Sequence, residues 1–365
     1  MGYFSDMDDG PHTTLRSFIR IIQKYYNVII IGFAKNKDLD SLKYWQIGNS
    51  KIILLKNYLS GHYYLNFLIF LKTIIFLNKA EFFLFNGIWY SYLPILSIFF
   101  KLLNKKYVIC PHGGLNAEKN ISIFKSFYYR FFIDFILKNS FFVQISSPLE
   151  LGLIKQNRFL KFKNFKYKLL PNTISINNQK SYLNDSYKNF AFFIGRVHPI
   201  KDLEFLINAW YQLNNKFTNN NLLLLIAGQG DDKYTKKLKK IVDKKGIRNI
   251  KFLGKISHYD KISLIKNAKF TTITSHTEAL PTTIIESLAL STPVLSTLKL
   301  GMRQILIKES VLYVEKDCEK FADKVWSIFN MQEEHYKDLK RKSYVTYEKY
   351  FSYKAIAKLV KKYYL

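Results

Sequence analysis

Short apolar runs alternate with segments of helical spacing along most of the chain. Between the runs, apolar residues three or four positions apart predict helices, as at Leu203, Leu206 and Trp210. The runs themselves predict strands at 27–33, 81–85, 107–110, 141–145, 190–194, 222–227, 251–253, 270–274 and 293–296. Strands that alternate with helices are typical of βαβ units, so the pattern predicts an α/β protein with parallel sheets.

This alternation of predicted strands and helices occurs in two halves of the chain, with a polar segment between them. The chain of 365 residues is long enough for two domains. We predict a first domain at 1–175, a linker at 176–189, a second domain at 190–345, and a C-terminal helix at 346–365 that packs back on the first domain. Two α/β domains of this kind bind ligands between the carboxyl ends of their strands.

The amino-acid composition narrows the classes of partner that the protein can bind. Lys and Arg number 56 against 27 Asp and Glu, a formal net charge of +29, which favours a polyanionic partner such as nucleic acid, an anionic membrane surface or a phosphorylated substrate. The two cysteines, Cys110 and Cys318, are too few for a disulfide scaffold or a Cys-rich metal site and suit a reducing cytoplasm. The apolar fraction of 48% excludes a disordered chain.

A membrane-spanning helix is not expected. The start of the chain lacks the basic and apolar regions of a secretory signal. Residues 82–100 carry no charge, but Asn86, Gly87 and Pro94 interrupt them. This segment therefore predicts a buried strand, a loop and an apolar helix that runs into Lys101.

Several segments are both basic and aromatic, namely 65–76, 121–142, 151–168 and the tail from His335. Interleaved cationic and apolar side chains are typical of surfaces that dock on an anionic bilayer. They are equally typical of ordinary amphipathic helices in a lysine-rich chain, so the sequence leaves both interpretations open.

Two segments of the second half carry candidate chemistry. Glu278 lies in the loop after the predicted strand 270–274, and Glu286 lies in the first turns of the next helix, whose open amides favour an anion. Alternatively, Glu286 completes a capping box with Thr283. Arg196 and Lys201 follow the strand 190–194, where two cations before a helix indicate a bound diphosphate or simply solvated lysine and arginine.

Other motifs point away from metal and dinucleotide chemistry. Gly228 and Gly230 lack the third glycine of a dinucleotide fingerprint. The chain has no P-loop, zinc-ligand spacing or nucleophile elbow. The Asp-x-Asp triplets at 6–8 and 38–40 do not follow a strand in the way that Mg²⁺ or Mn²⁺ sites require, so we expect no tightly bound metal and no cofactor.

Taken in order, these segments resemble the family 4 retaining glycosyltransferases, which have the GT-B fold of two Rossmann-like domains that face each other across a cleft. The likeness is most specific over 190–306. It rests there on Gly195-Arg196 with Lys201, Ala227-Gly228-Gln229-Gly230, Phe252-Leu253-Gly254, Glu278 to Pro281, and Glu286 with Thr292-Pro293. The first half shares weaker landmarks, at Asn86 to Trp89, Pro111 to Gly114, Ser146 to Glu150 and Pro171-Asn172.

The resemblance implies roles for individual residues. Arg196 and Lys201 would neutralise the diphosphate of a nucleotide sugar, and Glu278 would hold the hydroxyls of its sugar. Glu286 would bind the ribose, and His112 would lean against the donor from the acceptor domain. The catalytic set is then His112, Arg196, Lys201 and Glu278, and the donor-binding set is Gly10, Gly195, Arg196, Lys201, Gly254, Glu278, Ala279, Leu280 and Glu286. Gly10 stands where the family has a Gly-Gly turn, and Ala279 stands where it has a glycine.

The resemblance implies a retaining, metal-independent hexosyltransferase that moves a sugar from a nucleotide-diphosphate donor to an acceptor hydroxyl. The basic, aromatic first half suggests a glycan or glycolipid acceptor (lipopolysaccharide, capsule or exopolysaccharide) and a peripheral position on the cytoplasmic face of the cell membrane. One alternative is another GT-B enzyme, such as a nucleotide-sugar epimerase or a phosphorylase. A further alternative is an inactive basic module that binds membrane or nucleic acid, although no nucleic-acid motif is present.

Overall fold

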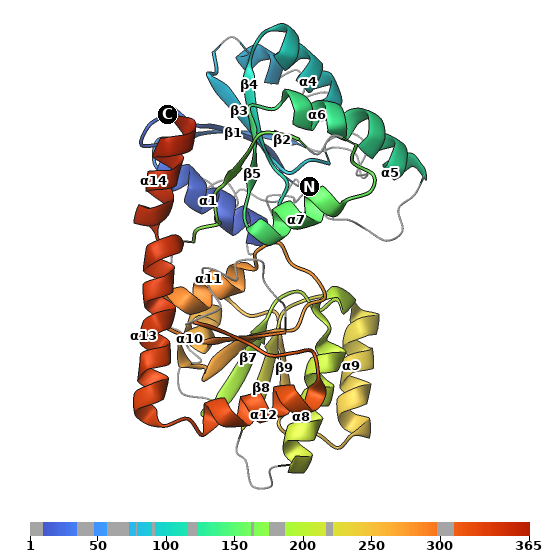
Figure 1. Ribbon diagram of the computed structural model, residues 1–365, viewed down its shortest axis with the longest axis vertical. Coiled ribbons are helices and arrows are strands. Elements are labelled where there is room, and N and C mark those ends of the chain that lie inside the picture. Colours follow the sequence, from blue (N-terminus) through green and yellow to red (C-terminus); the bar gives the residue numbers. More distant parts are fainter. Residues whose placement is uncertain are drawn as a thin grey trace. The chain divides into compact units, whose positions relative to one another are not determined.

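The computed structural model describes residues 10–34, 47–56, 73–77, 79–89, 92–115, 123–161, 164–174, 187–216, 222–297 and 310–365. The chain divides into two compact units, each with its own core. Unit 1 is Met1–Thr173 with Ile356–Leu365, and unit 2 is Ile174–Ala355 (Figure 1). The chain thus enters unit 2 at Ile174 and returns to unit 1 for its last residues.

Unit 1 is built on parallel strands. Its larger sheet has the order β3 (Phe82–Asn86), β4 (Lys106–Cys110), β5 (Phe142–Ile145) and β6 (Tyr167–Leu169), and a separate parallel pair is formed by β1 (Ile29–Ala34) and β2 (Lys51–Lys56). The helices are α1 (Gly10–Ile22), α4 (Leu93–Leu102), α5 (Ile123–Tyr128), a π-helical turn η1 (Tyr129–Ile133), α6 (Asp134–Asn139) and α7 (Pro148–Gln156). The predicted strands of this half are confirmed, whereas β2 and β6 are additional.

Strand β4 shows why its apolar run is continuous. Tyr107 and Ile109 pack into a core with α4, α6 and α7, whereas Val108 and Cys110 pack into a second core with α1 and the C-terminal helix. Successive side chains of a strand point to opposite faces, and here both faces are covered. An uninterrupted apolar strand is therefore the expected pattern.

Unit 2 has one six-stranded parallel sheet in the order β12-β11-β10-β7-β8-β9. The strands are β7 (Phe190–Ile194), β8 (Leu223–Ala227), β9 (Ile250–Gly254), β10 (Phe270–Ile273), β11 (Val294–Ser296) and β12 (Val311–Tyr313). After β9 the chain crosses back to the other side of β7, so β7 and β10 are neighbours. That reversal creates a topological switch point, where open α/β sheets bind their ligands.

The helices of unit 2 cover both faces of this sheet. Helices α8 (Leu203–Lys216), α9 (Asp232–Lys244) and α12 (Cys318–Phe329) share the largest core, and α10 (His258–Asn267) and α11 (Thr282–Ala289) pack into two further apolar clusters. Helix α13 (Glu333–Tyr350) lies against α11. The strand predictions in this half are confirmed within one residue at either end, and β12 is additional.

The C-terminal helix α14 (Tyr353–Tyr364) completes unit 1 from Ile356 onward. Ile356, Val360 and Tyr364 are buried against α1 and the sheet. The Tyr364 hydroxyl donates to Gln144 Oε1 at 2.6 Å, and the Tyr26 hydroxyl donates to the Tyr364 carbonyl at 2.6 Å. The last helix is therefore held by both packing and hydrogen bonds.

No helix in the described part of the chain is both long enough and apolar enough to cross a membrane. The charge-free segment 82–100 forms strand β3 and most of helix α4, as its interrupting Asn86, Gly87 and Pro94 predict.

Candidate active site

Two loops meet at the switch point of unit 2. One follows β7 and contains Gly195, Arg196 and a short 3₁₀-helix, η2 (Pro199–Lys201), and the other follows β10 and leads into α11. The Thr274 hydroxyl donates to the Lys201 carbonyl at 2.9 Å, and the His276 amide donates to the Ile200 carbonyl at 2.8 Å. The sequence places these loops more than 70 residues apart, and the adjacency of β7 and β10 brings them together.

Lys201 and Glu278 form an ion pair at the centre of this junction. The Ser275 hydroxyl donates to the same carboxylate oxygen, Glu278 Oε1, at 2.7 Å. The Lys201 and Glu278 side chains are 23% and 16% exposed, so both are reachable by a ligand while much of each is shielded from water. Arg196 lies exposed on the same loop as Lys201. The structure thus brings together two of the predicted catalytic residues and keeps a third beside them.

A second charged network connects the two loops, and no sequence motif indicates it. Asp202 has a left-handed backbone (φ 50°) and pairs with Lys316 and, at 3.6 Å, with His276 Nε2. Lys316 Nζ lies 3.0 Å from His276 Nδ1. A lysine donates, so His276 accepts at Nδ1 and carries its proton on Nε2, toward the Asp202 carboxylate. This network fixes the residues that flank Lys201 and Glu278.

Gly228 and Gly230 serve the packing of the neighbouring loop. A Cβ at Gly228 would lie 1.8 Å from the Gly195 carbonyl oxygen, and one at Gly230 would lie 1.9 Å from the Val197 carbonyl oxygen. The Val197 amide donates to the Gln229 carbonyl at 3.2 Å, and the Asp231 amide donates to the Val197 carbonyl at 3.2 Å. The glycines are therefore required for the close approach of two backbones that positions Gly195 and Arg196.

Glu286 lies inside α11 and forms an ion pair with Lys261 of α10, with 2.7 Å between Oε1 and Nζ. Their side chains are only 5% and 14% exposed. The capping-box alternative for Glu286 is wrong, because α11 begins at Thr282 after Pro281 and has no side-chain cap, which places Glu286 beyond the third helical position. Instead, Thr283 donates to the Ile194 carbonyl at 3.3 Å, which links α11 to the end of β7.

The remaining predicted donor residues of unit 2 lie at strand and helix ends. Gly254 is the last residue of β9, with φ 66°, and its carbonyl accepts from the Gly228 amide at 2.8 Å. Ala279 and Leu280 lie in the loop between Glu278 and α11, where Leu280 is buried in the core around α11. Gly195 directly follows β7 and donates to the Ala227 carbonyl at 3.1 Å.

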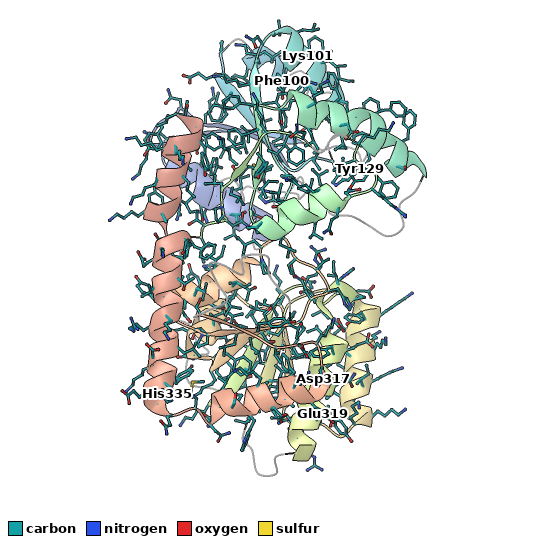
Figure 2. The ribbon with its side chains drawn as sticks, viewed as in Figure 1. Phe100, Lys101, Tyr129, Asp317, Glu319 and His335 are labelled. Atoms are coloured by element: carbon teal, nitrogen blue, oxygen red, sulfur yellow. The ribbon has the colours of Figure 1, made fainter. Side chains whose placement is uncertain are left out.

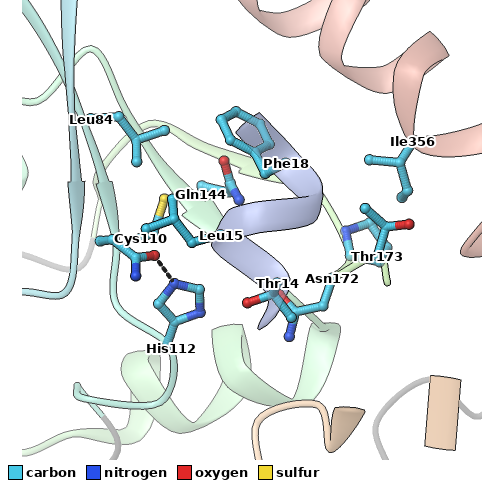
Figure 3. Close-up of a pocket in the computed structure, with 12 residues that line it drawn as sticks. Thr14, Leu15, Phe18, Leu84, Cys110, His112, Gln144, Asn172, Thr173 and Ile356 are labelled. Atoms are coloured by element: carbon cyan, nitrogen blue, oxygen red, sulfur yellow. Dashed lines mark hydrogen bonds between the residues drawn. The ribbon is translucent and has the colours of Figure 1, made fainter. Parts of the chain in front are cut away.

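Unit 1 has a pocket of its own, at the carboxyl ends of β3, β4 and β5 (Figure 3). Its lining consists of Thr14, Leu15, Phe18, Leu84, Asn86, Cys110, His112, Gln144, Pro171, Asn172, Thr173 and Ile356. His112 has a left-handed backbone (φ 49°), and its Nε2 lies 2.5 Å from Asn86 Oδ1. An amide oxygen only accepts, so Nε2 carries a proton. Burial raises the pKa of the Cys110 thiol, and the charge of Glu150 raises it further. Cys110 therefore lines the pocket as an unreactive thiol.

Glu150 holds the loop that presents His112. Its fully buried carboxylate accepts from the Gly113 amide at 2.6 Å, from the Ser146 amide at 2.8 Å and from the Ser146 hydroxyl at 2.6 Å. Trp89 Nε1 donates to the Gly114 carbonyl at 3.0 Å from the other side. From the sequence, Glu150 and Trp89 are only landmarks of the resemblance, and the structure gives them this positioning role.

Gly10 is the first residue of α1, the helix whose Thr14, Leu15 and Phe18 line the unit 1 pocket. The two Asp-x-Asp triplets, 6–8 and 38–40, lie outside the described residues. Within the described ranges, no three His, Cys, Asp or Glu side chains gather as metal ligands would. His112 belongs to unit 1, and Arg196, Lys201, Glu278 and Glu286 belong to unit 2.

Comparison with known proteins agrees with this architecture. Residues 175–346 match the family model described as glycosyl transferases group 1. The chain is 31% identical over 167 residues to the uncharacterized glycosyltransferase MJ1059 of Methanocaldococcus jannaschii, covering 43% of this chain and 40% of that protein. It is 26% identical over 207 residues to MJ1178 of the same organism, covering 54% of this chain and 56% of that protein. The aligned part thus spans about half the length of these relatives.

The similarity in structure covers nearly the whole chain, beyond the residues that the family model matches. The Anabaena protein Alr3699/HepE, crystallised with UDP and glucose, superposes with a TM-score of 0.76 at 15% identity, over 97% of this chain and 95% of that one. The chain therefore has the GT-B fold of glycosyltransferases, with two Rossmann-like α/β domains, as the sequence predicts.

Proposed function

We propose that this protein transfers a sugar from a nucleotide-diphosphate donor to an acceptor hydroxyl with retention of the anomeric configuration, as a family 4 hexosyltransferase. The observation that carries the proposal is the Lys201–Glu278 pair at the β7–β10 switch point, with Glu286 on the helix that follows. A cation for a diphosphate, a carboxylate for sugar hydroxyls and a second carboxylate for a ribose are the groups that a nucleotide sugar needs.

Each residue of unit 2 then has a distinct part. The diphosphate draws Lys201 from its pairing with Glu278, and Arg196 closes on the same phosphates from the exposed side of the loop. The freed Glu278 carboxylate accepts from the sugar hydroxyls, beside the amides of Ala279 and Leu280. Glu286 accepts from the ribose hydroxyls, with Lys261 orienting its carboxylate. Gly195 and Gly254 allow the donor close to the backbone.

The transfer itself breaks the bond between the anomeric carbon and the diphosphate oxygen and forms a bond from that carbon to the acceptor oxygen. The departing diphosphate gains negative charge, which Arg196 and Lys201 stabilise, and it accepts the proton of the acceptor hydroxyl. His112 has its part on the acceptor side of the reaction, where its Nε2 donates to Asn86 Oδ1 and Glu150 holds its loop in place. No resident metal takes part in this scheme.

For the donor, a UDP-sugar is the first choice, because the Anabaena neighbour was crystallised with UDP and glucose. For the acceptor, we propose a lipid-linked or cell-envelope glycan, such as a lipopolysaccharide, capsule or exopolysaccharide precursor, met at the cytoplasmic face of the membrane. The net charge of +29 supports a partner surface that is anionic.

A thermal-shift assay with UDP, GDP, ADP and their glucose conjugates tests the donor site. At about 100 times Kd, ligand binding stabilises the native state enough to raise the melting temperature by roughly 5–10 °C. We expect one nucleotide series to raise the melting temperature in this way. The variants Lys201→Ala and Arg196→Ala should lose this shift. Glu278→Ala should keep the shift caused by the nucleotide but lose the additional shift caused by its glucose conjugate. Lys320→Ala, which breaks an exposed Lys–Glu pair of unit 2, is the matched control and keeps the full response.

Proton NMR of the product then tests the reaction, since the anomeric coupling constant reports retention or inversion. Conversion of the nucleotide sugar without any acceptor would identify an epimerase, and release of a sugar phosphate from a glucan would identify a phosphorylase. The absence of any nucleotide response at millimolar concentration would contradict the proposed donor site.

A further inference from the structure

Helix α4 is apolar on two opposite faces. Leu93, Leu96 and Phe100 are fully buried in the core of unit 1. On the other side of the helix, the exposed fractions are 51% for Ile95, 48% for Ile98, 37% for Phe99 and 75% for Leu102. These four positions follow helical spacing and form one continuous stripe. A helix of this composition is normally buried all round, but this one presents a second apolar stripe to solvent.

The neighbouring helix adds exposed aromatic rings. Helices α5 and α6 and the π-helical turn η1 form one continuous helix, in which Phe127 is 55% exposed and Phe131 is 53% exposed. The centroids of these two rings lie 4.4 Å apart. Helix α4 contacts α6, as Lys101 Nζ lies 5.5 Å from the ring centroid of Phe135, about one turn beyond Phe131. We call Ile95, Ile98, Phe99, Leu102, Phe127 and Phe131 the α4–η1 surface.

Single exposed apolar residues are ordinary, but six on α4 and on the helix that continues from its neighbour α6 are typical of an interaction surface. Figure 2 labels two neighbouring residues of α4 that differ in burial: Phe100 is buried, and Lys101 is exposed. In Figure 1, α4 lies beside α6, with α5 continuing from it.

The charges around this surface are almost all positive. Along 93–106 and 131–139, one acid, Asp134, stands among the cations Lys101, Lys105, Lys106 and Lys138. The Asp134 carboxylate accepts from the Lys161 amide at 3.0 Å. Lys106 Nζ lies 5.0 Å from the ring centroid of Phe141, and Lys101 Nζ lies over the ring of Phe135, so both ammonium groups make cation–π contacts beside the apolar residues. Apolar side chains rimmed by such lysines match the hydrocarbon and the phosphates of an anionic bilayer.

Two of the other basic, aromatic segments bury several of their apolar side chains, although Tyr167 of 151–168 and Tyr344 and Val345 of the tail are exposed. Most of the segment 65–76 lies outside the described residues. In 151–168, the apolar residues Ile154, Leu160 and Phe165 are buried in the core of unit 1. In the C-terminal tail, Ile356 and Val360 are buried in the same way. For these buried residues ordinary amphipathic packing explains the pattern, whereas the apolar residues of the α4–η1 surface are exposed.

We propose that the α4–η1 surface is the face by which the protein docks on an anionic lipid bilayer. A second copy of the chain is a poorer occupant, because it would place its own lysines against those of the first. The inference rests on the proposed function for its purpose, since a transferase acting on a lipid-linked acceptor must hold its acceptor domain at the membrane.

Vesicle co-sedimentation at low salt tests the proposal, with phosphatidylcholine vesicles and with phosphatidylcholine–phosphatidylglycerol vesicles at 7:3. We expect the full-length protein to bind the anionic vesicles at least about tenfold more strongly than the neutral ones. The variant Phe99→Ser/Leu102→Ser/Phe131→Ser loses about tenfold or more of that binding. The matched control Tyr344→Ser/Val345→Ser removes residues that are 45% and 50% exposed on α13, and it binds as the wild type does.

Charge reversal provides a second test that leaves the apolar side chains in place. Lys101→Glu/Lys105→Glu reduces binding to the anionic vesicles by about tenfold or more and leaves the weak binding to neutral vesicles unchanged. The nucleotide thermal shift is measured on every variant; its retention shows that the variant is folded and keeps any failure at the membrane separate from a failure at the donor site.

Three results would overturn the proposal. One is a wild-type protein that stays in the supernatant with anionic vesicles while it still responds to a nucleotide. Another is a triple serine variant that binds vesicles as well as the wild type. The third is a dimer in sedimentation velocity that the triple variant converts to monomer without any effect on vesicle binding.

Discussion

At the scale of single residues, the two glycines after β8 are needed for steric reasons. Gly228→Ala and Gly230→Ala would push a methyl group to within 1.8 and 1.9 Å of backbone oxygens that cannot move independently. We expect each to lower the free energy of unfolding by about 2 kcal/mol or more in urea denaturation. Gly152→Ala in α7 is the control, because a Cβ there would meet nothing within 4 Å outside its own helix backbone and chain neighbours, and alanine favours a helix. Equal effects at Gly152 and Gly228 would contradict this explanation.

Glu150 gives a residue-scale prediction about the acceptor domain. Glu150→Gln replaces one acceptor oxygen with an NH₂ group that faces the amide of either Gly113 or Ser146. We expect a loss of about 1–3 kcal/mol in stability. We also expect kcat to fall while the nucleotide thermal shift is kept, because the His112 loop moves and the donor site does not. Glu315→Gln, at an exposed ion pair, changes neither quantity.

At the scale of elements, helices α10 and α11 are joined by the buried Lys261–Glu286 pair. Glu286→Gln leaves Lys261 without its charge partner in a site that is only 14% exposed, so we expect a loss of about 3 kcal/mol or more. The double variant Lys261→Met/Glu286→Leu regains most of this stability, because two apolar chains replace the pair. It does not regain nucleotide binding if Glu286 binds ribose, and thermal melts with and without nucleotide separate the two effects.

Elements also show where sequence reasoning succeeds. Nine strands are predictable because each contains a short apolar run, and the most regular of these, β7 and β10, are buried on both faces. The three-residue strands β6 and β12 are too short to show a period, and β2 escapes notice although 52–55 is an apolar run. The Lys201–Glu278 pair shows the limit of prediction from sequence. Both residues are identifiable from their loops, but their contact depends on the strand order around β7, which is a property of the whole sheet.

The networks that position the site are less visible still. Asp202, His276 and Lys316 come from three separate segments, and none stands in a recognisable motif. Likewise, the sequence identifies the pair Gly228 and Gly230 but not the carbonyls of Gly195 and Val197 that make them necessary. Local pattern therefore finds the residues of a site, and tertiary packing decides which of them meet.

At the scale of the whole molecule, buried tyrosines predict a loss of stability in alkali. Burial raises the pKa of Tyr107 and Tyr364 in unit 1, and raises the pKa of Tyr336 in unit 2 to about 12. The unfolded chain releases its phenolic protons near pH 10, while the folded chain keeps them. Above that pH the unfolded state binds fewer protons than the folded state, so the free energy of unfolding falls as pH rises.

Urea denaturation should give a nearly constant free energy of unfolding from pH 7 to 9. By pH 11 we expect a decrease of about 1 kcal/mol for each such tyrosine. Tyr336→Phe removes the titrating group of unit 2 together with its hydrogen bond to the Lys269 carbonyl at 2.8 Å, so this variant starts less stable and loses less between pH 9 and 11. Because Tyr336 lies in unit 2 and Tyr107 in unit 1, the corresponding Tyr107→Phe variant should flatten only the transition of unit 1 if the two units unfold separately. If the free energy of unfolding falls with pH as steeply in both variants as in the wild type, groups other than these tyrosines cause the loss of stability in alkali.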